Sequence, residues 1–393
     1  MCCARRLARL AFFVLTFAAL CFVGGFGQAE TLGRAGAGWL ESIDGYLVLH
    51  LKGTPHEMGV QHGKLLANHV RENMKFLLET KANETVMEAG PVKVTPKTIL
   101  PTIIQTQRPF VPEKYFEEMS GLAEGAGVKV EDVQQANFIP ELFHCSGFAL
   151  MNAATKDGTL YHGRVLDYGC DLRLQEHAVL IVQEPTGGIP FVNVSYAGFI
   201  GSVTGMNSQH VSIGEMGGKG LGQWQGTPMS LLVREVLESA QDLDAAVDVF
   251  QNHKRTCEYY YVIADAKSNR AVGIEATPEK LNTVDPGESH PRLAKPVKDT
   301  VLLSAGDRYE ELVKRVQRDY GKFDVDSARH LMDRPVAMKS NLHNALFEPR
   351  STRLWVANAS PSGQPAAQQK YYAFQLSELL KRHPDGAGTV DGN

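Results

Sequence analysis

Phe143-His144-Cys145-Ser146-Gly147-Phe148-Ala149 is the stretch from which the architecture of this chain can be worked out. It opens a strand-like run that ends at the turn Lys156-Asp157-Gly158, and a second strand-like run follows. An Asp-Gly pair between two such runs is typical of a β-hairpin. The hairpin brings the Cys145 thiol, the Arg164 guanidinium and the Asp167 carboxylate onto neighbouring strands. We therefore expect a nucleophilic site here.

The length of the turn sets which residue faces Cys145. A plain two-residue loop at Asp157-Gly158 pairs Cys145 with Cys170, and a disulfide then accounts for both cysteines. A loop of three or five residues centred on Lys156 instead pairs Cys145 with Asp167, which places the thiol beside a carboxylate. Cysteines of exported proteins are more often bonded than catalytic. A guanidinium and a carboxylate at these offsets nevertheless favour the nucleophile.

Three features of the hairpin bear on reactivity. Arg164 and Asp167 point to opposite faces of an ideal strand, and a bulge at Gly163 would turn both toward the thiol. A thiol attacks only as thiolate, and a nearby guanidinium lowers its pKa. If the bond between His144 and Cys145 is cut, Cys145 also gains an α-amine with a pKa of about 8, which is a base on the same residue.

Residues 1–29 have the pattern of an export signal. Three arginines precede the apolar run Leu10 to Val23, and Gly27-Gln28-Ala29 is a small-residue cleavage site. The apolar run is shorter than a membrane span requires. We expect an exported protein, in a periplasm, outside the cell or in a secretory lumen, with no stable membrane insertion.

Removal of that signal leaves Cys145, Cys170 and Cys257. An odd number in an oxidising compartment predicts one disulfide and one free thiol, with Cys170 and Cys257 as structural residues that could bond to each other. The net charge of -4, without runs of lysine or arginine, argues against nucleic acid as the main partner.

Hydrophobic periodicity predicts a mainly helical segment over residues 30–144 and a mainly β segment over residues 145–383, which together form one globular domain before a flexible tail at 384–393. Within the first segment, residues 90–112 are expected to be an irregular connection. The expected helices are 55–79, 113–125, 130–139, 227–240, 242–252 and 307–318. The expected strands are 145–153, 159–167, 178–183, 191–196, 211–215, 259–264, 271–275, 354–357 and 371–374. The prediction is an α+β fold in which helices cover a layered antiparallel core.

Fragments spread over most of the chain then point to a family through their order and spacing. They are Gly121-Leu122-Ala123-Glu124-Gly125-Ala126-Gly127, Cys145-Ser146-Gly147-Phe148-Ala149, Thr155-Lys156-Asp157-Gly158, Gly163-Arg164-Val165-Leu166-Asp167, Gly205-Met206-Asn207 and Glu279-Lys280-Leu281-Asn282. Together they resemble the autoproteolytic isopenicillin N acyltransferase-like family of N-terminal-nucleophile cysteine hydrolases and, more distantly, choloylglycine hydrolase. The resemblance implies a four-layer αββα sandwich of antiparallel sheets and a proenzyme that cleaves itself between His144 and Cys145.

The resemblance also implies roles for the hairpin residues. Cys145 is expected to be the nucleophile, Arg164 to support the thiolate and the substrate, and Asp167 to hold the new α-amine. Arg308 in Asp307-Arg308-Tyr309 matches a further arginine of the family.

The chain departs from the family at the asparagines of the oxyanion hole. Counted from Asn207, itself a candidate, the first expected position falls near Gly217 and the second near Ser289-His290. Backbone N–H groups at the glycines are the alternative donors. Glu215 is either a pocket residue or a solvated edge charge. The candidate substrate and oxyanion residues are thus Asn207, Glu215, Gly217, Ser289 and Arg308.

These observations predict an exported, self-processing cysteine amidohydrolase or acyltransferase that acts on a small-molecule amide or acyl substrate through a Cys145 acyl-enzyme. No metal or organic cofactor is expected, and a homo-oligomer is left open. One alternative is a thioesterase or lipid amidase with the same nucleophile. Another is a non-catalytic binding protein on the same fold.

Overall fold

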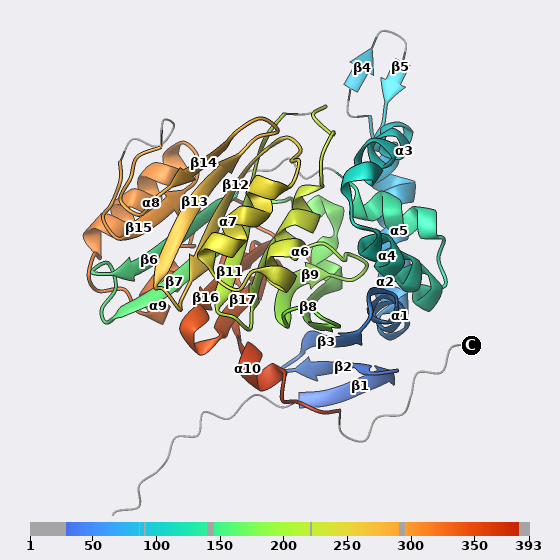
Figure 1. Cartoon of the computed structure of the whole chain (residues 1–393), viewed down its shortest axis with the longest axis horizontal. Coiled ribbons are helices and arrows are strands. Elements are labelled where there is room, and N and C mark those ends of the chain that lie inside the picture. The colour runs from blue at the N-terminus through green and yellow to red at the C-terminus, as the bar shows by residue number, and fades with distance from the viewer. Residues whose placement is uncertain are drawn as a thin grey trace, which may run out of the picture.

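The structure, a computed structural model, describes residues 29–85, 87–89, 92–139, 145–220, 222–290 and 295–384. Two β-sheets face each other, and helices lie on the outer face of each (Figure 1). The expected α+β sandwich of four layers is therefore confirmed. Its two sheets meet in an apolar layer built from Val48, Leu180, Phe347 and Val356, all with an exposed fraction of 1% or less.

The larger sheet has ten strands, and its neighbours are antiparallel except for one pair. In spatial order the strands are β1 (Ala29–Ala35), β2 (Gly38–Ile43), β3 (Tyr46–Gly53), β8 (Ala178–Pro185), β9 (Phe191–Tyr196), β10 (Thr204–Asn207), β11 (Val211–Lys219), β12 (Glu258–Asp265), β13 (Arg270–Ala276) and β14 (Leu281–Val284). The exception is the parallel pair β3–β8. Strands from before and after Cys145 therefore share one sheet.

The smaller sheet carries the hairpin and is antiparallel throughout. Its order is β15 (Thr300–Leu303), β6 (Ser146–Asn152), β7 (Gly158–Leu166), β16 (His343–Glu348), β17 (Arg353–Asn358) and β18 (Tyr372–Gln375). A separate two-stranded ribbon, β4 (Met87–Ala89) and β5 (Val92–Val94), projects beyond the helices (Figure 1).

The helices form the two outer layers. The ten-stranded sheet is covered by α1 (Pro55–Leu65), α2 (Ala67–Lys75), α4 (Glu113–Ala126), α5 (Val130–Asn137), α6 (Met229–Ser239) and α7 (Leu243–Asn252), with α3 (Pro96–Gln107) beside them. The six-stranded sheet is covered by α8 (Asp307–Arg318) and α9 (Val325–His330), and α10 (Leu376–Leu379) follows β18. Apolar residues of α8 such as Leu312 and Val316 pack with Phe148 of β6.

Helices α1 and α4 touch backbone to backbone through glycines. A Cβ atom at Gly59 would lie 2.1 Å from the carbonyl oxygen of Glu118, and one at Gly121 would lie 2.2 Å from that of His56. Contacts this short leave no room for a side chain. The glycines therefore fix how closely the two helices approach.

The segment before Cys145 differs from the expectations at three places. It holds mostly helices, but residues 29–53 are three strands, which the hairpin pair Asp44-Gly45, with φ angles of 53° and 88°, signals. The connection at 90–112 contains α3, which Pro96 starts as a first-turn proline. The expected helix over 55–79 ends at Leu65, and α2 and a π-helical turn follow.

The expected boundaries of the chain's segments fall mostly outside the described residues. The export signal lies outside them except for Ala29, which begins β1, and so do His144 and the tail from residue 385. Across the part of the chain that the structure does describe, no helix is both long enough and apolar enough to span a bilayer.

Candidate active site

The hairpin β6–β7 has neither of the two expected registers. Gly147 pairs with Arg164 and Ser146 with Val165, and the pairing becomes irregular between Leu150 and Asn152. Because the strand begins at Ser146, Cys145 lies just before it and beside the end of β7. The thiol is therefore opposite neither Cys170 nor the Asp167 side chain.

Gly163 is needed for packing and does not form a bulge. It pairs regularly with Phe148, and a Cβ atom here would lie 2.1 Å from the end of the Phe148 ring. Arg164 and Asp167 consequently keep the opposite faces of a regular strand. Arg164 faces the ten-stranded sheet and Asp167 faces α8.

Cys145 is a free, buried thiol with 5% of its surface exposed. Burial raises its pKa to about 11, while the Arg164 charge lowers it and the carboxylates of Glu215 and Asp167 raise it. The backbone N–H of Asp167 also hydrogen-bonds to the sulfur in its charged form and lowers the pKa. Cys170 and Cys257 are free as well, so the predicted disulfide is wrong.

Arg164 reaches across to the ten-stranded sheet. Its side chain is fully buried and lies over Gly214, where a Cβ atom would be 2.5 Å from the Arg164 Cγ. Its Nη2 lies 3.3 Å from Glu215 Oε2. Burial raises the pKa of Glu215 to about 7, and the Arg164 charge opposes that rise. Glu215 is therefore a buried residue and not a solvated edge charge.

Several polar atoms of this pair lack a hydrogen-bond partner. They are Nε and Nη1 of Arg164 and Oε1 of Glu215, and Nε2 of nearby His162 is a further case. Buried polar atoms in proteins are usually bonded. The Arg164–Glu215 pair is therefore incompletely hydrogen-bonded within the protein.

Asp167 is held by groups that are distant in the sequence. Its Oδ2 accepts a hydrogen bond from Nη1 of Arg308 on α8 at 2.6 Å, and its Oδ1 accepts one from the Met338 N–H at 2.9 Å. Burial raises the pKa of Asp167 to about 6, whereas these donors lower it. Arg308 also lies 3.3 Å from the Ser146 hydroxyl and 3.5 Å from the Cys145 carbonyl oxygen.

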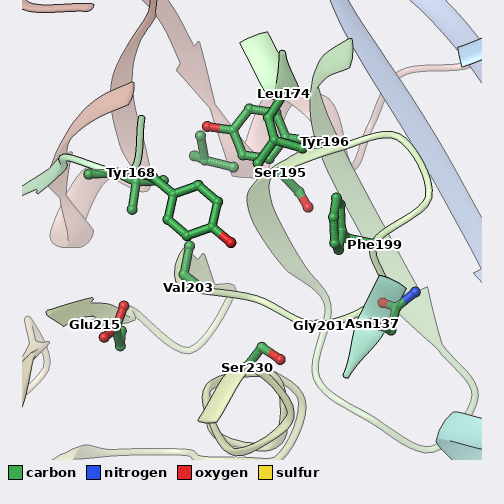
Figure 2. Close-up of a pocket in the computed structure, with 12 residues that line it drawn as sticks. Asn137, Tyr168, Leu174, Ser195, Tyr196, Phe199, Gly201, Val203, Glu215 and Ser230 are labelled. Atoms are coloured by element: carbon green, nitrogen blue, oxygen red, sulfur yellow. The ribbon is translucent and has the colours of Figure 1, made fainter. Parts of the chain in front are cut away.

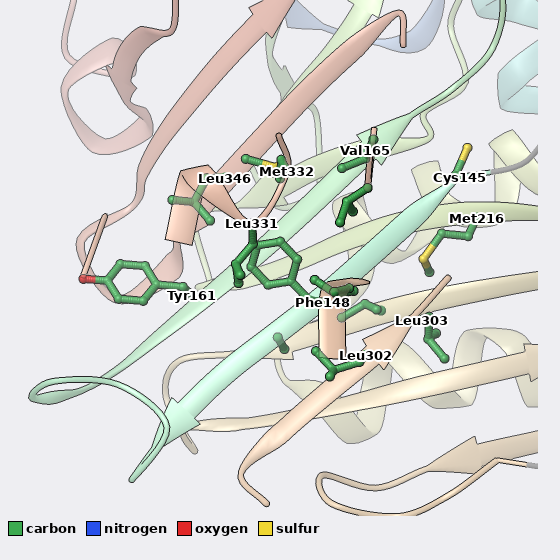
Figure 3. Packing of buried hydrophobic residues seen from close by; sticks show 14 of the residues in the cluster. Cys145, Phe148, Tyr161, Val165, Met216, Leu302, Leu303, Leu331, Met332 and Leu346 are labelled. Atoms are coloured by element: carbon green, nitrogen blue, oxygen red, sulfur yellow. The ribbon is translucent and has the colours of Figure 1, made fainter. Parts of the chain in front are cut away.

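A pocket of about 300 Å3 opens at Cys145 between the two sheets. It is lined by Cys145, Met216, Gly217, Gly218, Lys219, Glu258, Tyr260, His290, Leu303, Ser304, Ala305, Gly306 and Arg308. Figure 3 shows Cys145 at the end of its strand, beside Met216. The structure thus brings Cys145, Gly217 and Arg308 together, as the sequence predicts.

A smaller pocket of about 50 Å3 lies beyond Glu215 (Figure 2). Its wall is largely apolar and aromatic and includes Leu166, Tyr168, Tyr196 and Phe199. Leu166 and Glu215 connect it to the hairpin, because Leu166 ends β7 and Glu215 contacts Arg164.

Two sequence candidates lie outside these pockets. Asn207 is fully buried, and its amide donates hydrogen bonds to the carbonyls of Leu237 and Ala240, so its role is structural. Ser289 is exposed, while its neighbour His290 is buried and lines the pocket. Of the pair Ser289-His290 at which the sequence count falls, His290 is therefore the residue in the pocket wall.

Gly217 and Gly218 form an irregularity in β11. Met216 pairs with Tyr260 and Lys219 pairs with Glu258, so one extra residue is inserted between them. A bulge leaves backbone groups outside the ladder. A Cβ atom at Gly218 would lie 1.8 Å from the Glu258 carbonyl oxygen, so only glycine fits.

Two facing, largely antiparallel sheets between helical layers, with a candidate nucleophile at the start of a hairpin strand, define the fold of the N-terminal-nucleophile hydrolases. Residues 153–290 match the family described as Acyl-coenzyme A:6-aminopenicillanic acid acyl-transferase. The chain resembles this family over those residues.

Individual relatives cover different shares of the chain. Protein dcd1A of Dictyostelium discoideum is 26% identical over 359 residues, which are 80% of this chain and 79% of that protein. The N-acylethanolamine-hydrolyzing acid amidase of Rattus norvegicus is 24% identical over 183 residues, 44% of this chain and 49% of that protein. Acid ceramidase of the same species is 25% identical over 214 residues, which are 46% of this chain and 52% of that protein. The match thus spans about half the length of these two amidases.

A solved structure shares part of the arrangement. The Caenorhabditis elegans ortholog of N-acylethanolamine-hydrolyzing acid amidase aligns with a TM-score of 0.42 at 18% identity, over 52% of this chain and 93% of that one.

Proposed function

We propose that this protein is an exported, self-processing cysteine amidohydrolase or acyltransferase with Cys145 as its nucleophile. The observation that carries the proposal is the free Cys145 thiol in the wall of a 300 Å3 pocket, with Arg164 lowering its pKa from the next strand. A thiol is a competent nucleophile once a neighbouring cation or base removes its proton.

Self-processing is the first step of this mechanism. The Cys145 sulfur attacks the carbonyl carbon of His144, the C–N bond breaks, and the proton lost by sulfur passes to the nitrogen. Water then hydrolyses the thioester, which leaves a carboxylate on His144 and a free α-amine on Cys145. In the intact chain burial raises the pKa of the thiol to about 11, which slows this step, and the nearby Arg164 charge opposes that rise.

Substrate turnover follows the same chemistry. The α-amine takes the thiol proton, sulfur attacks the amide carbonyl, and the amine half leaves with that proton. Water or another amine then releases the acyl group. Asp167, fixed by Arg308, is placed to orient the α-amine, and the backbone of the Gly217-Gly218 bulge offers donors for the oxyanion.

The two pockets suggest how the substrate lies. The apolar pocket bounded by Tyr168, Tyr196 and Phe199 suits the acyl group. The larger pocket is also largely apolar, but it carries the polar side chains of Glu258, Tyr260 and His290 and suits the amine half. The scissile bond then lies at Cys145, between the two.

Replacing Cys145 by alanine tests the proposal. The wild-type protein is expected to give two fragments by intact mass, one beginning at Cys145, and to cleave an amide substrate. The Cys145→Ala protein is expected to remain one inactive chain, while Cys170→Ala, the matched control, is processed and active. A Cys145→Ala protein that is cut and active refutes the proposal.

The alternative of a lipid amidase or thioesterase with the same thiol is favoured by one observation, the aromatic and aliphatic lining of the smaller pocket. The relatives named for N-acylethanolamines and ceramide agree with it. Offering one acyl group as an ester, as a lipid amide and as a peptide-like amide separates these activities. If the protein is instead a non-catalytic binding protein, its chain is expected to stay uncut. The free thiol of Cys145 argues against this alternative.

A further inference from the structure

The connection between β9 and β10, residues 197–203, is a loop that lies inside the protein. Ala197, Gly198 and Ile200 are all buried, and the chain turns at Gly198, whose φ angle is 98°. Loops normally run over the surface, because buried backbone groups must find hydrogen-bond partners. This loop therefore depends on partners from other parts of the protein.

Two buried side chains of helices α1 and α2 hold the start of the loop. His62 Nε2, on α1, accepts a hydrogen bond from the Gly198 N–H at 3.0 Å. Asn73, on α2, donates one to the Ala197 carbonyl oxygen at 2.9 Å. Both side chains belong to residues that are 1% exposed. Burial lowers the pKa of His62 to about 3, so Nε2 keeps the lone pair that the Gly198 N–H needs.

Asn137, on α5, holds the loop at two more places. Its amide donates a hydrogen bond to the Gly198 carbonyl oxygen at 2.9 Å, and its Oδ1 accepts one from the Ile200 N–H at 2.8 Å. Helices α1, α2 and α5 all precede Cys145. In a chain cut ahead of that residue, the loop would belong to one piece and its three anchors, one on each of these helices, to the other.

The loop in turn places Phe199 in the wall of the apolar pocket (Figure 2). Its neighbour Ile200 packs into the apolar cluster beneath the helices, whereas Phe199 packs against the cluster that includes Cys145. Groups on the helix side of the loop therefore fix the position of Phe199 on the pocket side.

We propose that the three anchors, His62, Asn73 and Asn137, determine which acyl groups the protein accepts. They do so by holding Phe199 in the wall of the apolar pocket. The inference rests on the proposed function, because it assigns this pocket to the acyl group. His62 and Asn73 are positioning residues, since they act through the loop. The segment before Cys145 thereby stays part of the specificity site after processing.

The size of the pocket sets the direction of the selection. The pocket has a volume of about 50 Å3, and Asn137 and Ser230 line both this pocket and a second one of about 20 Å3. The Ser230 carbonyl oxygen also accepts a hydrogen bond from the Ser202 N–H of the loop at 3.0 Å. Loss of an anchor lets the loop move and the two spaces join, so longer acyl groups gain. One methylene group in an apolar pocket is worth about 10- to 200-fold in discrimination.

Thioesters of one thiol with acetyl, butanoyl, hexanoyl and octanoyl groups measure this selection. The Cys145 sulfur takes the acyl group, the thiol leaves, and peptide mass spectrometry gives the rate of acylation at Cys145 for each acyl group. In the wild-type protein the butanoyl group is expected to react at least about tenfold faster than the octanoyl group.

Histidine variants assign the selection to the anchors. His62→Leu leaves the buried Gly198 N–H without an acceptor and is expected to bring the ratio of butanoyl to octanoyl rates close to one. His62→Gln, whose amide can accept the same hydrogen bond, is expected to restore the wild-type ratio. His56→Leu, at an exposed position of the same helix, is the matched control and is expected to leave the ratio unchanged. A general loss of folded protein would slow all four acyl groups alike and leave the ratio as it is.

Phe199→Ala tests whether the anchors act through the loop. It removes the ring directly and is expected to lower the ratio as His62→Leu does. Because both changes act on the same wall, His62→Leu is expected to add no further change in the Phe199→Ala background. Effects of the two changes that simply add would overturn the inference.

The same measurement separates this inference from the proposed function. If no thioester acylates Cys145 in the wild-type protein, the proposed function itself is wrong. If Cys145 is acylated, but with equal rates for all acyl groups, with a preference for octanoyl, or with a ratio that His62→Leu leaves unchanged, the inference alone is wrong.

Discussion

Asp167 forms its ion pair with Arg308, 2.6 Å away on α8, and not with Arg164, three residues before it in the chain. The side chains of Arg164 and Asp167 point to opposite layers of the fold. Arg164 forms an ion pair with Glu215, and Asp167 forms one with Arg308. The Cys145 thiol lies where these two pairs meet. Its charge state therefore depends on both.

The Arg164–Glu215 pair is expected to move the pKa of Cys145 in opposite directions. Arg164→Gln removes the charge that lowers it, so the pKa rises, and Glu215→Gln removes one that raises it, so the pKa falls. One pKa unit is a tenfold change in thiolate, so alkylation by iodoacetamide at pH 8 should slow or quicken about tenfold. Peptide mass spectrometry across pH measures this. Shifts of the same sign in both variants contradict the electrostatic account.

Arg308→Gln is expected to move the acidic limb of kcat/KM to higher pH. The Asp167 pKa is about 6, and Arg308 holds it below the value that burial alone would give. Without Arg308 the carboxyl gains its proton at higher pH, so activity that needs the carboxylate is lost earlier on acidification. Arg308→Lys, which keeps the charge, is the control. A limb that stays in place in both variants argues against a role for the Asp167 carboxylate.

Gly218→Ala is expected to lower kcat by about 100-fold, because loss of one oxyanion donor typically has this effect. The new Cβ atom cannot be placed 1.8 Å from the Glu258 carbonyl oxygen, so the bulge must shift. Gly273→Ala, where the nearest contact is 3.1 Å, serves as a control in the next strand but one. Unchanged kcat in a Gly218→Ala protein that melts normally would remove this bulge from the mechanism.

Gly121→Ala is expected to destabilise the fold by at least about 1–3 kcal/mol, because overpacking forces backbone shifts. Its Cβ atom would lie 2.2 Å from the His56 carbonyl oxygen. The exposed neighbour Ser120 provides the control, and Ser120→Ala should stay within about 0.5 kcal/mol. Denaturant unfolding in a Cys145→Ala background, where the chain stays intact, measures both. Equal midpoints would mean that α1 and α4 can separate without cost.

The sequence predicts the hairpin and a layered antiparallel core covered by helices because these depend on local signals, whereas the four layers follow from the family resemblance. Alternating residues around an Asp-Gly turn identify β6 and β7, and α8 matches its expected bounds, Asp307–Arg318. The register differs by one residue from the alternative that pairs Cys145 with Asp167. The irregularity lies between Leu150 and Asn152, and no residue type there indicates it. The same local pair, Asp44-Gly45, also marks the β2–β3 hairpin.

The site was predicted less completely because its parts come from distant segments. Arg308 meets Asp167 only after α8 packs on the six-stranded sheet. His290 follows β14 and enters the pocket through its contact with Glu275, a relation that spacing along the chain does not reveal. Asn207 is of the expected residue type, but its buried amide donates hydrogen bonds to carbonyl oxygens at the end of α6.

The parallel pairing of β3 with β8 has a consequence for a chain cut ahead of Cys145. The N-terminal piece would stay in the ten-stranded sheet through β1, β2 and β3, because β3 is hydrogen-bonded to β8 of the other piece. Processing would therefore yield a two-chain molecule and would not release a peptide. Once unfolded, the halves would have to find each other by diffusion. The mature protein would then refold less readily after unfolding than the single chain does.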